Sequence, residues 1–233
     1  MSIPLPEDLA PFAITRIAAP IRTQVEQRLR QAIIRGHFRP GSRLIERELC
    51  TLLGVSRTSL REALRHLEGD GLVINIPHKG LVVATMTREE AEEVYQVRAA
   101  LEGLAGRLFA ERATDEQRAA LQAALAAVVV AEQSAALPAL VDAKDHFYAV
   151  LVGGATNRTL GAILQSLQDR IAALRYLTLA ERGRAAQSVA EMGRILAAVL
   201  ARDPAAAEEA CVVHVEAAAV VAAQLLQQEE GHS

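Results

Sequence analysis

The chain has 233 residues, enough for one large domain or two small ones with a sizeable core. Hydrophobic residues make up 51% of it and aromatic residues only 3%, so Ala, Leu and Val must fill the core, which favours packed helices and argues against an all-β enzyme. The net charge of −3 is unevenly distributed, because residues 1–86 carry +4 and residues 87–233 carry −7. This asymmetry predicts that only the first third contacts a polyanion.

Cysteine use and hydropathy indicate a cytoplasmic protein. Cys50 and Cys211 lie far apart and form neither a disulfide framework nor a CxxC metal site, as expected in a reducing compartment. The N-terminus lacks a basic region followed by an apolar run, so we expect no signal peptide. Polar residues interrupt the most apolar windows, so we expect no membrane span.

The first third of the chain begins with an arm and a helix. Residues 1–20 contain four of the eight prolines and no sustained period, which predicts a mobile arm. Residues 21–35 predict an amphipathic helix that ends at Gly36. Its apolar face consists of Ile21, Val25, Leu29, Ala32 and Ile33.

The next elements predict a winged helix. Residues 45–53 form a short helix that Gly54 ends, and a tight turn joins it to a helix that Ser56 or Thr58 can cap. After Gly71, the β-rich segments "LVINI" and "LVVAT" flank "PHKG", which predicts a hairpin. A helix-turn-helix followed by a two-stranded hairpin is a winged helix, which we place at residues 21–86.

Residues 87–233 predict helices only. Capping boxes at Thr87–Glu90 and Thr114–Gln117 open the first two, and Pro138 starts a third. Residues 157–180 predict a fourth helix and residues 185–202 a fifth, and Asp203–Pro204 opens the sixth. The stripe of the first helix consists of Val94, Val97, Leu101, Leu104 and Leu108. The expected fold is therefore mainly α, a winged helix followed by an antiparallel six-helix bundle.

The helix after Gly54 carries an arginine stripe opposite its leucine stripe. Its apolar positions are Leu60, Ala63, Leu64 and Leu67. Burying them turns Arg57, Arg61 and Arg65 outward, and places Ser56, Thr58 and Ser59 at the end that a recognition helix points into the major groove. Arginine can donate two hydrogen bonds to guanine or pair with phosphate.

An ordinary solvated face is the alternative for this helix, with Arg61 and Arg65 compensated by Glu62 and Glu68. The tight turn before the helix and the basic hairpin tip at His78 and Lys79 favour DNA binding instead. Because one short helix reads few base pairs, we expect a homodimer on a short pseudo-palindromic operator.

The same segment resembles the winged-helix domain of the GntR family of bacterial transcription factors. The shared patterns are G-x-x-x-P-G-x-x-L-x-E, L-G-V-S-R-T and R-E-A-L-R-x-L-E-x-x-G-L, within residues 21–86. Ser59 stands where many members have proline. The resemblance implies DNA contacts from Arg47, Arg57, Thr58, Ser59 and Arg61, and a wing tip at His78, Lys79 and Gly80.

Residues 88–225 resemble the ligand-binding domain of the FadR subfamily, called FCD, and six helices suit its VanR-like branch. The similarity includes "FYAVLVGGATNRTL" and "AEMGRILAAVLARDPAAAEEACVVHV". Many such domains hold a divalent metal with one Asp and three His. The corresponding positions here are Lys144, Tyr148, Met192 and His214. This set does not suit a hard or borderline ion, so no metal cofactor is expected.

Three hypotheses for the bundle interior remain open. The implied positions, together with Arg98, could bind an anionic organic effector directly. Alternatively, Lys144 reaches solvent and the cavity is collapsed or empty. A metal site of Asp142, His146 and His214 is the third, but Asp142 and His146 are offset by two residues from Lys144 and Tyr148, which rotates them by about 200°.

The sequence contains no phosphate loop, GxSxG, HExxH or Cys/His pairing in a strand-turn context, so we predict no enzyme. A helical adaptor protein would not explain the basic first third. The prediction is a DNA-binding transcriptional regulator, a repressor relieved by a small anionic metabolite.

Overall fold

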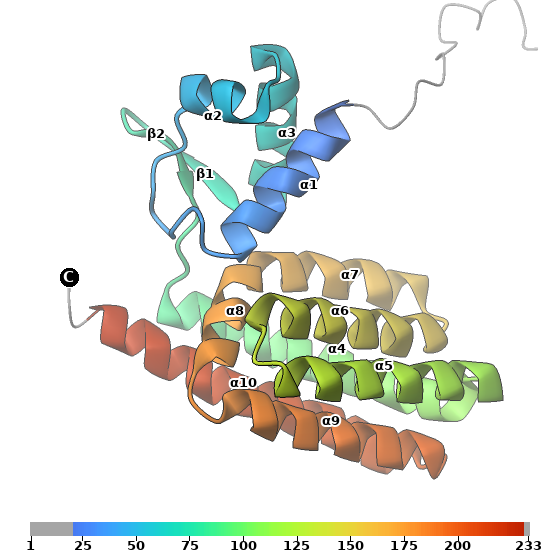
Figure 1. The fold of residues 1–233 in the computed structure, drawn as a ribbon. Helices are drawn as coiled ribbons and strands as arrows, with labels where there is room; N and C mark the ends of the chain where they lie inside the picture. Colours follow the sequence, from blue (N-terminus) through green and yellow to red (C-terminus); the bar gives the residue numbers. More distant parts are fainter. Residues whose placement is uncertain (1–20, 231–233) are drawn as a thin grey trace, which may run out of the picture.

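The computed structural model describes residues 21–230, and the predicted arm at residues 1–20 lies outside them. A small winged helix stands on one side of a larger helical bundle, with the lower end of its first helix beside α7 and α8 (Figure 1). The elements of the winged helix are α1 Ile21–Ile34, α2 Glu46–Leu53, α3 Arg57–Gly69, β1 Val73–Ile76 and β2 Gly80–Val83.

The predicted turn and hairpin are confirmed. Gly54 takes the left-handed conformation (φ 65°) that ends α2, and its N–H bonds to the carbonyl of Cys50. Ser56, rather than Thr58, caps α3 by accepting a hydrogen bond from the backbone N–H of Ser59 at 3.3 Å. The strands pair antiparallel with Val73 opposite Val83. The leucine face of α3 is buried, which leaves its arginines on the outer side.

The bundle consists of α4 Arg88–Arg112, α5 Asp115–Gln133, α6 Leu137–Gly154, α7 Arg158–Arg170, α8 Ala172–Ala180, α9 Arg184–Leu200 and α10 Pro204–Glu230. Both capping boxes are present, and Asp203 accepts from the N–H of Ala206 at 3.0 Å.

The predicted fourth helix is wrong as a single element. It divides into α7 and α8 at Ile171, so the described residues contain seven bundle helices rather than six. Ile171 has a ψ of 7°, far from the helical value of about −42°. Its side chain is fully buried in one cluster with Tyr95, Leu174 and Val215, which stabilises the change of direction.

Helices α4 and α10 pack closely because two glycines of α4 face α10. A Cβ on Gly106 would lie 2.8 Å from the carbonyl oxygen of Ala207 and 2.6 Å from Sγ of Cys211. A Cβ on Gly103 would lie 2.9 Å from the side chain of Val212. This contact places two residues of the bundle interior, Arg98 on α4 and His214 on α10, on neighbouring helices.

The apolar stripe predicted for α4 is only partly buried. Val97 is 48% and Leu104 is 36% exposed, and α10 carries Val213 and Val220 at 42% and 58%. By length and composition alone, residues 204–228 of α10 would suffice to cross a membrane, with a mean hydropathy of 1.6. A core helix meets the same criterion, and α10 contributes buried residues to two clusters of the bundle.

A candidate DNA-binding face and a buried charged cluster

The outer end of α3 presents the predicted DNA-binding residues to solvent. Arg57 and Thr58 are exposed, as is Arg47 on α2. Arg61 donates from Nε to both carboxylate oxygens of Glu46, each at 3.0 Å. The partner of Arg61 is thus a carboxylate on α2 and not the neighbouring Glu62. Bonding through Nε leaves the two terminal nitrogens of this guanidinium for another acceptor.

The wing tip is a tight turn that projects its basic residues. The N–H of Lys79 bonds to the carbonyl of Ile76 at 3.1 Å, and His78 has a φ of 64°. Proline at the second position and a positive φ at the third are typical of a type II turn. Both His78 and Lys79 are exposed, and Gly80 begins β2 with a φ of 82°.

A hollow of about 460 Å³ separates α3 from the wing. Its basic lining residues are Arg43, Arg61 and Arg65. Arg43 was not among the predicted DNA-binding residues, because only its antiparallel bridge to Val82 places it beside the wing. Neither Arg43 nor Arg65 has an ion-pair partner among the side chains that the structure describes. The hollow adds positive charge between the two predicted DNA-contacting elements.

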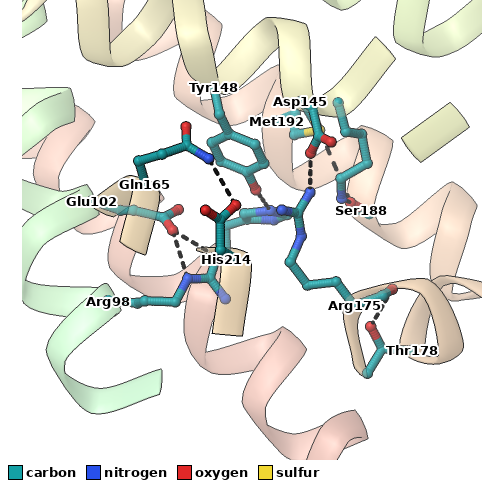
Figure 2. Close-up of polar contacts among 12 residues, drawn as sticks. Arg98, Glu102, Asp145, Tyr148, Gln165, Arg175, Thr178, Ser188, Met192 and His214 are labelled. Atoms are coloured by element: carbon teal, nitrogen blue, oxygen red, sulfur yellow. Dashed lines mark hydrogen bonds and ion pairs between the residues drawn. The ribbon is translucent and has the colours of Figure 1, made fainter. Parts of the chain in front are cut away.

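Figure 2 labels Arg98, Tyr148 and His214, which belong to the five predicted effector-binding residues, in the interior of the bundle. With one further residue, they make up the four of these five that line one small cavity. These are Arg98, Lys144, Tyr148 and His214. Met192 is fully buried nearby, with its sulfur 4.0 Å from the hydroxyl of Ser188, and does not line the cavity. Arg175 and Arg184 line it as well, and neither was predicted, because no local sequence signal marks either residue as buried.

A hydrogen-bonded chain crosses this cluster. His214 contacts the hydroxyl of Tyr148 through Nε2 at 2.5 Å and a carboxylate oxygen of Glu191 through Nδ1 at 2.5 Å. Burial lowers the pKa of His214 to about 4, so its imidazole is neutral at pH 7. Glu191 opposes the effect of its burial by accepting bonds from His214 and Arg184, which lowers its pKa. Neutral His214 therefore donates from Nδ1 to Glu191 and accepts from Tyr148.

The remaining cations have separate partners. Arg98 donates from Nε and Nη2 to Glu102 at 2.9 and 2.6 Å, and both side chains are buried. Arg175 of α8 pairs with Asp145. Lys144 is 5% exposed and donates to Ser188 rather than reaching solvent, so the hypothesis that it does reach solvent is wrong. Burial, followed by repulsion from Arg175, lowers the pKa of Lys144 to about 7.

The cavity itself has a volume of about 20 Å³, room for about one water molecule. The Nη1 atoms of Arg98 and Arg184 are buried without a hydrogen-bond partner in the described part of the chain. Unsatisfied donors beside a buried lysine create a need for acceptors, which an anion would supply.

Comparison with known proteins agrees with both halves of this structure. The model of bacterial regulatory proteins of the gntR family matches residues 21–83, and the FCD domain model matches residues 93–217. The HTH-type transcriptional regulator YdhC of Bacillus subtilis (strain 168) is 30% identical over 196 residues, which cover 84% of this chain and 88% of YdhC. The chain belongs to the GntR family.

Similarities to other proteins also extend over most of the chain. The HTH-type transcriptional repressor GlaR of Escherichia coli (strain K12) is 29% identical over 189 residues, covering 78% of this chain and 86% of GlaR. The structure of E. coli McbR/YncC is similar in fold, with a TM-score of 0.79 and 22% identity over 89% of this chain and 99% of that one. The predictions of a mainly α winged-helix regulator and of a protein that is not an enzyme are confirmed.

The metal site found in many FCD domains does not fit this GntR-family chain. Lys144 stands at the aspartate position, and both nitrogens of His214 already have protein partners. The alternative metal set is not brought together either, because Asp142 and His146 are exposed while His214 is buried. Asp142 instead pairs at 3.5 Å with Arg35, the residue that follows α1. Within residues 21–230, no group of three His, Cys, Asp or Glu residues is arranged for a metal.

Proposed function

We propose that the chain is an operator-binding repressor that acts as a homodimer in the cytoplasm and responds to a small anionic metabolite. The observation that carries the DNA-binding part is the exposed end of α3 beside the exposed wing tip. Arg57 and Arg61 read bases in the major groove, while Thr58 and Ser59 let the backbone approach phosphate. Ser56 holds the helix end through its cap.

Glu46 positions Arg61 in this proposal. Its ion pair fixes the guanidinium relative to α2, where exposed Arg47 contacts the DNA backbone. Lys79, His78 and Gly80 contact phosphate or the minor groove from the wing. The recognition helix and the wing thus bind neighbouring grooves of one operator half-site.

Two-fold symmetry would double the site that a single α3 can read. The outward face of α4 and α10 supports a homodimer through the bundle, because Val97, Leu104, Val213 and Val220 leave apolar surface exposed there. A charge on this face, as in Val220→Glu, should shift the protein to monomer in analytical ultracentrifugation. An unchanged dimer would show that the interface lies elsewhere.

Repression is inferred by analogy with GlaR, which is named a repressor. The effector part rests on the buried cluster, whose unpartnered guanidinium nitrogens favour an anion. In the FCD domains that hold metal, the ion supplies positive charge. In this chain, four side chains supply positive charge without a metal ion, namely Lys144, Arg98, Arg175 and Arg184.

The test is operator binding by arginine variants. An operator can be selected from random-sequence DNA and used in gel-shift titrations. Arg57→Ala and Arg61→Ala should each lose roughly 1–3 kcal/mol of binding free energy. Arg194→Ala, which removes an exposed arginine of α9, is the matched control and should bind normally. Normal operator affinity in both α3 variants would show that this helix does not lie in the major groove.

A further inference from the structure

A second pocket adjoins the charged cluster at the boundary with the winged helix. Its volume is about 310 Å³, and Tyr148 and Arg175 line both it and the small cavity. Ile34 from the end of α1 lines the same pocket, together with residues of α6, α7 and α8. The pocket is thus the space next to the cluster that the winged helix also borders.

The boundary pocket and the cavity among the charged side chains differ in volume, and therefore in what each can bind. The cavity among the charged side chains holds about one water molecule, too little for an organic effector. The adjoining pocket falls at the lower end of the range for small-molecule sites, about 300–1,000 Å³. A metabolite that reaches Arg175 therefore has room for its body only on the boundary side.

We propose that this boundary pocket binds an organic anion whose acid group pairs with Arg175 and whose body carries hydroxyl or amide donors. The inference rests on the effector part of the proposed function. Apolar side chains such as Val141, Val152 and Leu164 form part of the wall. Asp145 and Asp169 present carboxylates to the same space, so a body without donors would cover acceptors that it cannot bond.

Arg175 is placed to take an acid group. Its guanidinium lies 5.8 Å from the ring centre of Tyr148 and pairs with Asp145, whose side chain is 53% exposed. Asp145 accepts from Arg175 through one carboxylate oxygen, whereas a ligand carboxylate or phosphate can accept two parallel hydrogen bonds from a guanidinium. On ligand binding, Arg175 exchanges the solvent-exposed carboxylate of Asp145 for the acid group of the ligand, which is shielded from water inside the pocket. Asp145 is then free to accept a hydrogen bond from a donor on the ligand body.

Another lining residue, Asp169, connects the pocket to the recognition helix. Asp169 accepts a hydrogen bond from Gln165 at 3.0 Å and pairs with Arg30 of α1 at 3.1 Å. Arg30 also pairs with Asp70, the residue that follows α3. A ligand that bonds to Asp169 competes with Arg30, so occupancy of the pocket should alter how the winged helix is held on the bundle.

The experiment attaches a charge inside the pocket and therefore requires no knowledge of the natural ligand. Ala149 is exposed on α6 and lines the pocket. Ala149→Cys is made in full-length protein carrying Cys50→Ser, while Cys211 stays in place because burial raises its pKa. One sample is labelled with 2-sulfonatoethyl methanethiosulfonate and one with the trimethylammonioethyl reagent, so that the adducts are of similar size and opposite charge.

The sulfonate adduct should raise the melting temperature and change operator affinity by about fivefold or more. The ammonium adduct should lower the melting temperature. Ala139→Cys, on an exposed position of α6 outside the pocket, should show neither effect with either reagent. With Asp169→Asn added, the sulfonate should still stabilise the protein but lose its effect on DNA binding.

Equal thermal effects of the two adducts at position 149 would overturn the anion site, and an operator effect that survives Asp169→Asn would overturn the link through Arg30. Unlabelled protein that fails to bind the operator would instead refute the proposed function.

Discussion

Replacing Lys144 by methionine should stabilise the protein, and the gain should depend on pH. Lys144 is buried, its hydrogen-bond partner is neutral Ser188, and Arg175, Arg184 and Arg98 all disfavour its charge. Its pKa falls from 10.5 to about 7. The folded state therefore binds the lysine proton less tightly than the unfolded state does.

The magnitude follows from that fall in the pKa, from 10.5 to about 7. At about 1.4 kcal/mol per unit, charged Lys144 costs the folded state about 5 kcal/mol relative to a solvated lysine. This cost is complete below pH 7 and declines as pH rises towards 10.5, where both states lose the proton. Loss of the Ser188 bond offsets about 1 kcal/mol of the gain from Lys144→Met. The net gain should be about 4 kcal/mol near pH 6, reach zero at about pH 10, and become a loss of about 1 kcal/mol above pH 10.5, where only the lost Ser188 bond remains.

Urea denaturation at pH 6, 8 and 9.5 measures this difference directly. Lys79→Met is the matched control, because Lys79 is the other lysine of the chain and is exposed at the wing tip. With only two lysines, ¹³C-lysine NMR can also follow each side chain separately. A stability difference independent of pH, or a Lys144 signal that titrates near 10.5, would refute the reasoning.

Three further predictions concern DNA, packing and metal. Lys79→Ala should weaken binding to every duplex and reduce the slope of log affinity against log salt concentration by the amount expected for about one phosphate contact. A slope equal to that of the unmodified protein would show that the wing does not contact DNA. Gly106→Ala should cost about 1–3 kcal/mol of unfolding free energy, whereas Gly193→Ala, with open space around its Cβ, should not destabilise. Elemental analysis of purified protein should find no stoichiometric zinc, nickel or manganese, and one tightly held ion per chain would contradict the donor set at Lys144 and His214.

Local signals in the sequence predicted most of the fold. Capping boxes at Thr87 and Thr114, the left-handed Gly54 and the Pro-Gly hairpin each act within a few residues, so their chemistry is visible without tertiary contacts. The break at Ile171 was missed for the opposite reason. The helical period continues across it, and only packing with Tyr95 and Val215 from other helices determines the change in direction.

The two candidate sites differed in how far they could be predicted, because one depends on residues close in sequence and the other on tertiary contacts. The DNA-binding face is nearly contiguous, and its arginine stripe follows from the burial of four neighbours on one helix. The charged cluster takes residues from α4, α6, α8, α9 and α10. Arg175 and Arg184 resemble solvated arginines in sequence, because nothing local distinguishes an inward from an outward guanidinium.

The pairing of charges in the cluster explains why an anion is the expected partner. Arg98 has Glu102, Arg175 has Asp145 and Arg184 has Glu191, which leaves Lys144 as the cation without a carboxylate of its own in the described part of the chain. The unliganded protein meets this imbalance by lowering the pKa of Lys144. An effector whose acid group pairs with Arg175 would offset the repulsion between Arg175 and Lys144 and raise that pKa again. Above pH 7, effector binding would then take up a proton, and affinity would fall by up to about tenfold for each unit of pH.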